Sequence, residues 1–428
     1  MNENYGNLNH QPKPEPWYLK SDGVILPDDY NPYTDEASAF KEIFDENPSQ
    51  FLGADKLAYE TPDMYTLRME REKEIVKQRS YFNLKKTSGF ISLMLLISML
   101  LIEGLTTGAS FFALALPATY TNLINNVFSI ISYVALFPAV MYVATVGRRT
   151  KTFTHFKKPK TGACYIIRWS VIAFGISYMA SVLSTLIFDT LRSYGVYIND
   201  GATPPPNGVA EHITYFMLAV ICAPIFEEIL FRGVLLTPLT KYGSWFAAVT
   251  TGLLFGLYHQ THTQFLFATV FGIILAFIDM RAGSVIPSII AHACFNAYSY
   301  LTTLTLSFTN YAQTLADPQL TLDGPAIALA LVGALQLIMY ALMLSALILL
   351  VYEIVKDKKQ FIFRKTDCSL SIGTRISAFI THPLTVLLLI ITLMSIASSA
   401  VMETELASLN SDTLREMIRE YADMCYLE

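Results

Sequence analysis

The sequence predicts an all-α protein, a polytopic bundle of about nine transmembrane helices. Of its 428 residues, 53% are hydrophobic and only 15% are charged, whereas soluble domains are nearer one quarter charged. Apolar runs of about 20 residues, long enough to cross a bilayer as helices, recur along the chain. The five cysteines are scattered without a CxxC pair, so neither a disulfide framework nor a thiolate metal site is expected.

Residues 1–87 are expected to form a cytosolic arm that is partly disordered. Up to about residue 60 the arm is polar and rich in proline, a composition that favours disorder. It has no basic start and no apolar core, so no cleavable signal peptide is expected. Thr61-Pro62-Asp63 predicts a helix start, because a capping threonine precedes a proline at the first helical position. The charged helix that follows leads into the membrane.

The transmembrane bundle is predicted to occupy residues 88–402, with nine spanning segments: 88–113, 123–146, 164–189, 212–236, 244–260, 264–280, 284–304, 325–354 and 381–402. Loops that are rich in lysine and arginine alternate with loops that hold almost none. Lysine and arginine cluster before residue 88, between 146 and 164, and after 354, whereas residues 190–210 hold only Arg192 and 304–324 hold none.

Because cytoplasmic loops carry the excess of basic residues, this alternation predicts a cytoplasmic N-terminus. The tail, residues 403–428, is then extracytoplasmic. Its apolar residues at helical spacing predict an amphipathic helix, which lies on the outer membrane surface or packs against the protein's own loops. The expected location is the plasma membrane of the cell.

An acidic pair interrupts the fourth predicted span, in Glu227-Glu228-Ile229-Leu230-Phe231-Arg232. A charge at membrane depth costs a few kcal/mol or more, so it is normally paired or faces a functional cavity. Glu228 and Arg232 lie four residues apart on one helical face and are predicted to form a structural ion pair. Glu227 is rotated about 100° away and has no such partner in the sequence, which makes it the candidate for chemistry.

Three more polar groups lie in nearby spans. His259 ends the fifth, and His292 and Asn296 share a face of the seventh. Small residues such as Gly252 and Gly256 allow close helix packing, so we expect one shared polar cavity. His259 lies roughly 21–24 Å along its helix from the cytoplasmic end. The fifth span must therefore tilt strongly or begin below the membrane surface.

These residues suffice chemically for amide hydrolysis. Glu227 could act as general base, and His259 could help to orient and deprotonate a water molecule. His292 and Asn296 could then donate hydrogen bonds to an oxyanion. Alternatively, Glu227, His259 and His292 could hold a divalent metal such as Zn²⁺, because three protein ligands and a water form a common catalytic zinc site.

The motifs resemble those of the CPBP intramembrane proteases, which include the type II CAAX prenyl proteases and bacteriocin-processing or self-immunity proteins. The family pattern EExxxR, FxxxH and HxxxN is matched in order, over residues 219–298, by Glu227, Glu228, Arg232, Phe255, His259, His292 and Asn296. The resemblance implies a helical core whose site opens toward the cytoplasm. It also implies that the first glutamate and first histidine activate water and that the last pair binds the oxyanion.

The leading hypothesis is an intramembrane endopeptidase that acts on a membrane-associated or prenylated peptide or protein. Of the two mechanisms, that of a metallopeptidase is slightly favoured, because two histidines and a buried carboxylate are less costly beside a cation. The alternative is a transporter or scaffold that uses the same polar cavity. Transport requires a polar path to both faces, and the apolar outer halves of the spans favour hydrolysis in a cavity closed on one side. The expected partners are the peptide substrate and the lipid bilayer, and no nucleic acid.

Overall fold

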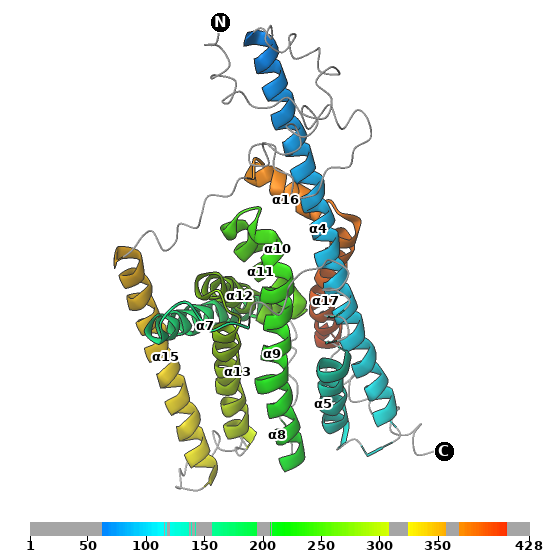
Figure 1. The fold of residues 1–428 in the computed structure, drawn as a ribbon. Helices are drawn as coiled ribbons and strands as arrows, with labels where there is room; N and C mark the ends of the chain where they lie inside the picture. Colours follow the sequence, from blue (N-terminus) through cyan, green and yellow to red (C-terminus); the bar gives the residue numbers. More distant parts are fainter. Residues whose placement is uncertain are drawn as a thin grey trace, which may run out of the picture. The chain divides into compact units, whose positions relative to one another are not determined.

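The computed structural model describes residues 62–114, 116–117, 120–136, 138, 142, 156–194, 206, 208–307, 324–356 and 368–408. All regular structure in these ranges is helical, which confirms the predicted all-α class (Figure 1). The chain divides into two compact units, Met1–Ser80 and Tyr81–Glu428, and the candidate site lies in the second. The predicted arm up to residue 61 and the tail beyond residue 408 lie outside the described residues.

The first described helix, α4 (Pro62–Ala113), begins at the proline that predicted a helix start. It runs unbroken through the charged segment and the first predicted span. Its apolar part packs against a bent helix pair, α16 (Ile372–Ile380) and α17 (Pro383–Ser408). The Thr385 hydroxyl lies 2.6 Å from Ser88 Oγ and 2.8 Å from Ser92 Oγ. These contacts join helices that are almost 300 residues apart in the chain.

The acidic pair lies on a continuous run of helical pieces, which we call the acidic rod. Its geometry alternates between α- and π-helical. Its pieces are α8 (Val209–Phe216), η6 (Met217–Cys222), α9 (Ala223–Glu228), η7 (Ile229–Leu236) and α10 (Thr237–Thr240). π-helical turns are rare and often occur at functional sites. Here they flank the short α-helical segment that carries both glutamates.

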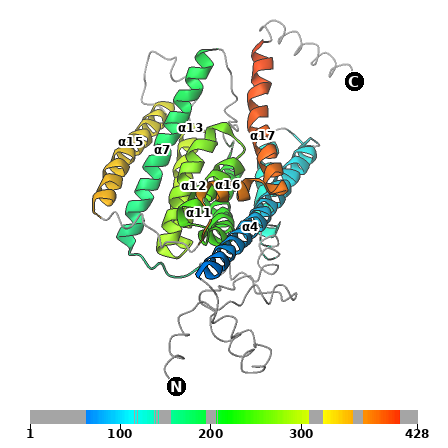
Figure 2. The same cartoon turned by 90° about the horizontal axis from the view of Figure 1, so that it is seen from above.

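The remaining helices of the core pack in a series, in which α11 contacts α12, α12 contacts α7 and α7 contacts α15. Figure 2 shows α7 between α15 and the α11–α12 pair. Besides these, α13 follows α12 and contacts the acidic rod. The bounds are α7 (Ala163–Ser193), α11 (Ser244–Tyr258), α12 (His262–Ala282), α13 (Ile286–Ser307) and α15 (Gly324–Lys356).

Close packing of α11 on α12 depends on small residues, as predicted. A methyl group added at Gly252 would lie 2.8 Å from the Ile273 backbone nitrogen and 2.9 Å from the Thr269 carbonyl oxygen. An ion pair joins α7 to α15, where Arg168 Nε lies 2.6 Å from Glu353 Oε1.

A short helical segment formed by α5 (Thr121–Ile131) and η4 (Ser132–Leu136) lies beside α8. The Asn126 side-chain amide donates to Thr214 Oγ1 at 3.3 Å across this contact. The segment corresponds to the first half of the second predicted span, and it brings Tyr133 toward the acidic rod.

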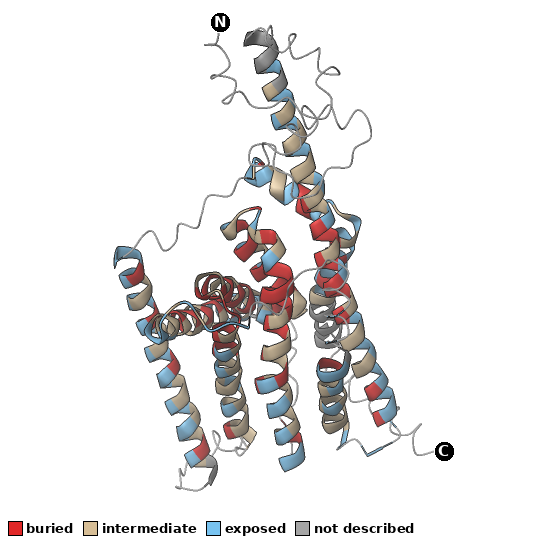
Figure 3. Ribbon diagram, viewed as in Figure 1, coloured by how far each residue is buried: buried red, intermediate tan, exposed pale blue. Residues whose placement is uncertain are grey.

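Burial is concentrated where the acidic rod meets α11 and α12, whereas α15 is exposed along most of its length (Figure 3). An apolar helix with little protein around it is expected to face lipid. The buried centre therefore coincides with the part of the chain that carries the predicted motifs.

Within the described ranges, five helices are long and apolar enough to cross a membrane, or six if α16 and α17, which meet at 79°, form one broken span. They match six of the nine predicted segments. The fifth predicted segment is α11, whose 15 residues measure about 22 Å, less than a hydrocarbon core of about 30 Å. A helical membrane protein is thus supported, while the nine spans and the cytoplasmic N-terminus stay predictions.

Candidate active site

Glu227 is buried on α9, with only 6% of its surface exposed. One carboxylate oxygen is held by the Tyr133 hydroxyl, which donates to Oε1 at 3.0 Å, and the Tyr133 ring stacks on Phe226 with centroids 5.9 Å apart. The other oxygen, Oε2, has no hydrogen-bond partner among the described residues. Glu227 therefore combines a fixed orientation with one free, buried acceptor.

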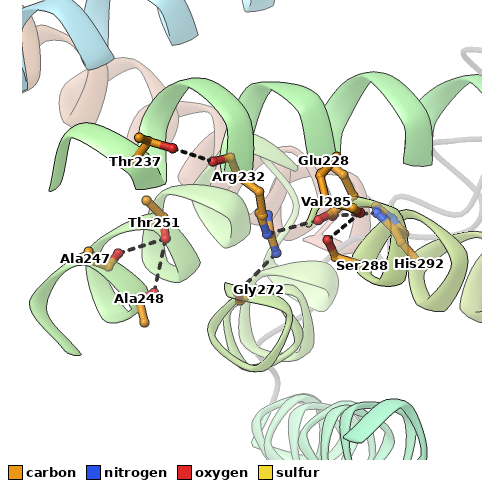
Figure 4. Close-up of polar contacts among 10 residues, drawn as sticks. All are labelled: Glu228, Arg232, Thr237, Ala247, Ala248, Thr251, Gly272, Val285, Ser288 and His292. Atoms are coloured by element: carbon orange, nitrogen blue, oxygen red, sulfur yellow. Dashed lines mark hydrogen bonds and ion pairs between the residues drawn. The ribbon is translucent and has the colours of Figure 1, made fainter. Parts of the chain in front are cut away.

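Glu228 and Arg232 form the predicted ion pair, with 3.0 Å between Glu228 Oε2 and Arg232 Nε and no exposed side-chain surface on either residue. The second oxygen, Glu228 Oε1, lies 3.0 Å from His292 Nδ1 on α13. Arg232 also donates to the Gly272 carbonyl oxygen of α12 at 3.1 Å. Figure 4 shows Glu228 between Arg232 and His292. Glu228 and Arg232 together thus link the acidic rod to α13 and α12.

This geometry fixes how the His292 ring is protonated. A carboxylate oxygen only accepts hydrogen bonds, so Nδ1 carries the proton. Nε2 is then an acceptor in the neutral ring and becomes a donor only when the imidazole takes up a second proton.

A third buried carboxylate, Asp279 on α12, interacts electrostatically with Arg232 and Glu228. It is 4% exposed, and its Oδ1 has no hydrogen-bond partner in the described part of the chain. Asp279 was not among the predicted site residues, although it is an acid inside the sixth predicted span and so carries the signal that singled out Glu227. Arg232 is therefore the common counter-charge of this acidic cluster.

His259 ends α11 and is oriented by its own helix. Its Nδ1 lies 2.7 Å from the Phe255 carbonyl oxygen, which only accepts, so Nδ1 carries the proton and Nε2 of the neutral ring is an acceptor. The Phe255 ring contacts both histidines, with its centroid 4.8 Å from that of His259 and 5.7 Å from that of His292. The two predicted histidines thus flank one aromatic ring.

The turn after His259 has unusual backbone geometry, because Gln260 has a φ of 55°, a conformation that L-residues other than asparagine and aspartate seldom adopt. The Gln260 side-chain amide donates to Glu103 Oε1 of α4 at 3.2 Å. This contact ties α4 to the turn that presents His259.

Asn296 lies one helical turn beyond His292 on α13, and its side-chain amide donates to the Ala219 carbonyl oxygen at 2.8 Å. Ala219 belongs to η6. His292 and Asn296 therefore face the same acidic rod, as their spacing predicted. Since an amide nitrogen carries two protons, Asn296 retains a second N–H that can be donated.

Among the described residues, no group of three His, Cys, Asp or Glu side chains is arranged to hold a metal ion. Glu227, His259 and His292 therefore do not fit a three-ligand metal site in this geometry. Binding of Zn²⁺ stays a prediction.

Tyr133 is the second site residue that the sequence analysis missed. It lies inside the second predicted span, away from the ends where membrane tyrosines are most common, and a buried tyrosine hydroxyl usually has a partner. Nothing in the sequence indicates that this partner is Glu227, 94 residues further along the chain.

Residues 209–298 match the family model described as type II CAAX prenyl endopeptidase, Rce1-like. The matched segment contains all seven residues of the three motifs, and it supports the activity of an intramembrane endopeptidase. No curated protein and no solved structure matches the chain. Residues 209–298 are thus similar to the Rce1-like type II CAAX prenyl endopeptidases, which is consistent with the CPBP family that the motifs resemble.

Proposed function

We propose that the protein cleaves a peptide bond in a membrane-associated or prenylated peptide or protein, using a water molecule activated by Glu227. One observation carries the proposal: Glu227 has a free carboxylate oxygen in a buried setting, while its other oxygen is fixed by Tyr133. A general base needs an unoccupied lone pair and a defined direction. The adjacent residue, Glu228, contacts Arg232 and His292.

In the first step the water oxygen attacks the carbonyl carbon of the scissile bond. A carbon–oxygen bond forms, the carbonyl electron pair moves to oxygen, and a water proton moves to Glu227 Oε2. The acceptor nitrogen of His259 is suited to hold the second water hydrogen. When the tetrahedral intermediate collapses, the carbon–nitrogen bond breaks and Glu227 returns the proton to the leaving amine.

The developing oxyanion needs hydrogen-bond donors, which typically contribute about 10²–10³ in rate each. The second N–H of Asn296 is available for this role. His292 can donate from Nε2 in the form that carries a proton on both ring nitrogens, and Glu228 orients the ring by accepting from Nδ1. Glu228 and Arg232 are then positioning residues, because they act through His292.

The finer assignments belong to the same proposal. The substrate reaches the site from the bilayer, and the protein resides in the plasma membrane. The N-terminus is cytoplasmic, as the distribution of lysine and arginine indicates. A metal-assisted mechanism is the alternative, and it would require Glu227, His259 and His292 to adopt an arrangement that can hold a metal ion, unlike the one described. Transport through the same cavity is the alternative function. Transport would not require the chemistry of Glu227.

The decisive experiment measures cleavage of a farnesylated peptide, and of its unprenylated counterpart, by purified protein in lipid vesicles. Glu227→Gln should abolish cleavage while the protein stays folded, because glutamine retains the acceptor for Tyr133 but cannot take the proton. Glu211→Gln is the matched control, since Glu211 is a buried acid of the same rod. Cleavage at the wild-type rate by Glu227→Gln would disprove the assignment of the base.

A further inference from the structure

Tyr258, the last residue of α11, places a second phenol near Glu227. Its hydroxyl is buried and has no hydrogen-bond partner among the described residues, yet it interacts electrostatically with Glu227. A buried hydroxyl without a partner is uncommon in proteins and calls for an explanation, such as a bound water. Tyr258 belongs to none of the three sequence motifs.

Ring packing positions this phenol beside the acidic rod. The Tyr258 ring packs edge-on against Phe231, with centroids 5.5 Å apart. Phe231 lies four residues after Glu227, about one helical turn along the same face. The Tyr133 ring stacks on Phe226, the residue directly before Glu227. Two phenols thus approach Glu227, and the electrostatic interaction between Tyr133 and Tyr258 supports their proximity.

The two phenols differ in what they contact. Tyr133 donates directly to Glu227 Oε1, which leaves Glu227 Oε2 and the Tyr258 hydroxyl as two buried polar groups without partners. One group is an acceptor and the other can donate. A water molecule satisfies both, because it can donate to Oε2 and accept from the phenol.

Ser98 on α4 is the other polar neighbour of the Tyr258 hydroxyl. The Ser98 hydroxyl donates its proton to the Met94 carbonyl oxygen at 2.6 Å. It interacts with the Tyr258 hydroxyl, but it lies outside full hydrogen-bonding geometry, so that hydroxyl stays without a partner within the described ranges. Tyr258 therefore retains its donor for the site.

We propose that the Tyr258 hydroxyl and Glu227 Oε2 together bind the water molecule that attacks the substrate. The inference rests on the proposed function and adds a residue to its machinery. The phenol donates to one lone pair of the water oxygen, Glu227 accepts one water proton, and the second lone pair attacks the carbonyl carbon. Tyr258 keeps its own proton throughout and orients the nucleophile.

The test compares Tyr258→Phe with wild-type protein in the vesicle cleavage assay. Removal of one donor to the water should lower kcat roughly 10- to 100-fold with an unchanged KM, because the phenol contacts the water and not the substrate. The melting temperature should not rise, since a hydroxyl that already binds water leaves no unsatisfied group to relieve. Wild-type kcat, or a clear gain in melting temperature, would overturn the proposal.

Two variants serve as controls. Tyr165→Phe makes the same chemical change at another buried hydroxyl without a hydrogen-bond partner, on α7 and outside the motif set, and should keep wild-type kcat. Ser98→Ala should also keep wild-type kcat. A loss of kcat equal to that of Tyr258→Phe would show that the phenol binds Ser98 and not the attacking water. Retained cleavage by Glu227→Gln would refute the proposed base itself, whatever Tyr258→Phe does.

Discussion

Replacing Glu228 by alanine tests whether the buried ion pair is structural. Glu228 has no exposed side-chain surface and contacts Arg232 and His292 at 3.0 Å each. Alanine leaves the guanidinium of Arg232 without its nearest counter-charge and His292 Nδ1 without an acceptor. Arg232 retains the Gly272 carbonyl oxygen and the longer-range electrostatic interactions with Asp279 and Glu227.

The size of the effect follows from this geometry. Two unit charges 3.0 Å apart attract by about 5–6 kcal/mol at an effective dielectric constant near 20. Breaking a buried pair by removing one partner typically costs about 3–5 kcal/mol. We expect a loss of about 3–5 kcal/mol, which lowers the melting temperature by roughly 3–6 °C for a chain of this length.

This loss is measured by thermal unfolding in mild detergent. Unfolding is monitored through the reaction of a thiol dye with Cys222, which is buried on η6. Serine at the other four cysteines, Cys164, Cys294, Cys368 and Cys425, leaves Cys222 as the thiol that reports unfolding. Glu74→Ala is the control, because its pair with Lys77 is half exposed and is worth about 1 kcal/mol or less. If Glu228→Ala and Glu74→Ala melt at the same temperature, the ion pair does not stabilise the fold.

Three further outcomes are expected. Removing metal with 1,10-phenanthroline should leave cleavage unchanged, and a loss restored by Zn²⁺ would instead establish the metal-assisted mechanism. Lys157 should be modified only from the cytoplasmic side and a cysteine replacing Ser307 only from outside; labelling of both from one side would contradict the nine-span topology. Gly252→Ala should destabilise the protein by about 1–3 kcal/mol, because the new methyl group would lie 2.8 Å from the Ile273 nitrogen. Gly333→Ala is the control and should leave stability unchanged, because open space surrounds that position. Equal melting temperatures of the two variants would show that α11 and α12 can separate at no cost.

The sequence alone determined the features that depend on composition and on short spacing. Repeated apolar runs require helices in a bilayer, because backbone groups there must pair within their own segment. The Glu228–Arg232 pair is a four-residue spacing within one helix, so it could be predicted before the fold was known. The order of the three motifs likewise sufficed to indicate the family.

The tertiary structure decided the contacts between helices that are remote in the chain. Glu228 meets His292 across 64 positions and Tyr133 meets Glu227 across 94, and neither contact has a local signature. Asp279 and Tyr258 join the cluster for the same reason. These partners are set by how the helices pack, whereas sequence periodicity specifies only which face of each helix a residue occupies. The sequence therefore named the acid, and only the fold showed which of its oxygens is free.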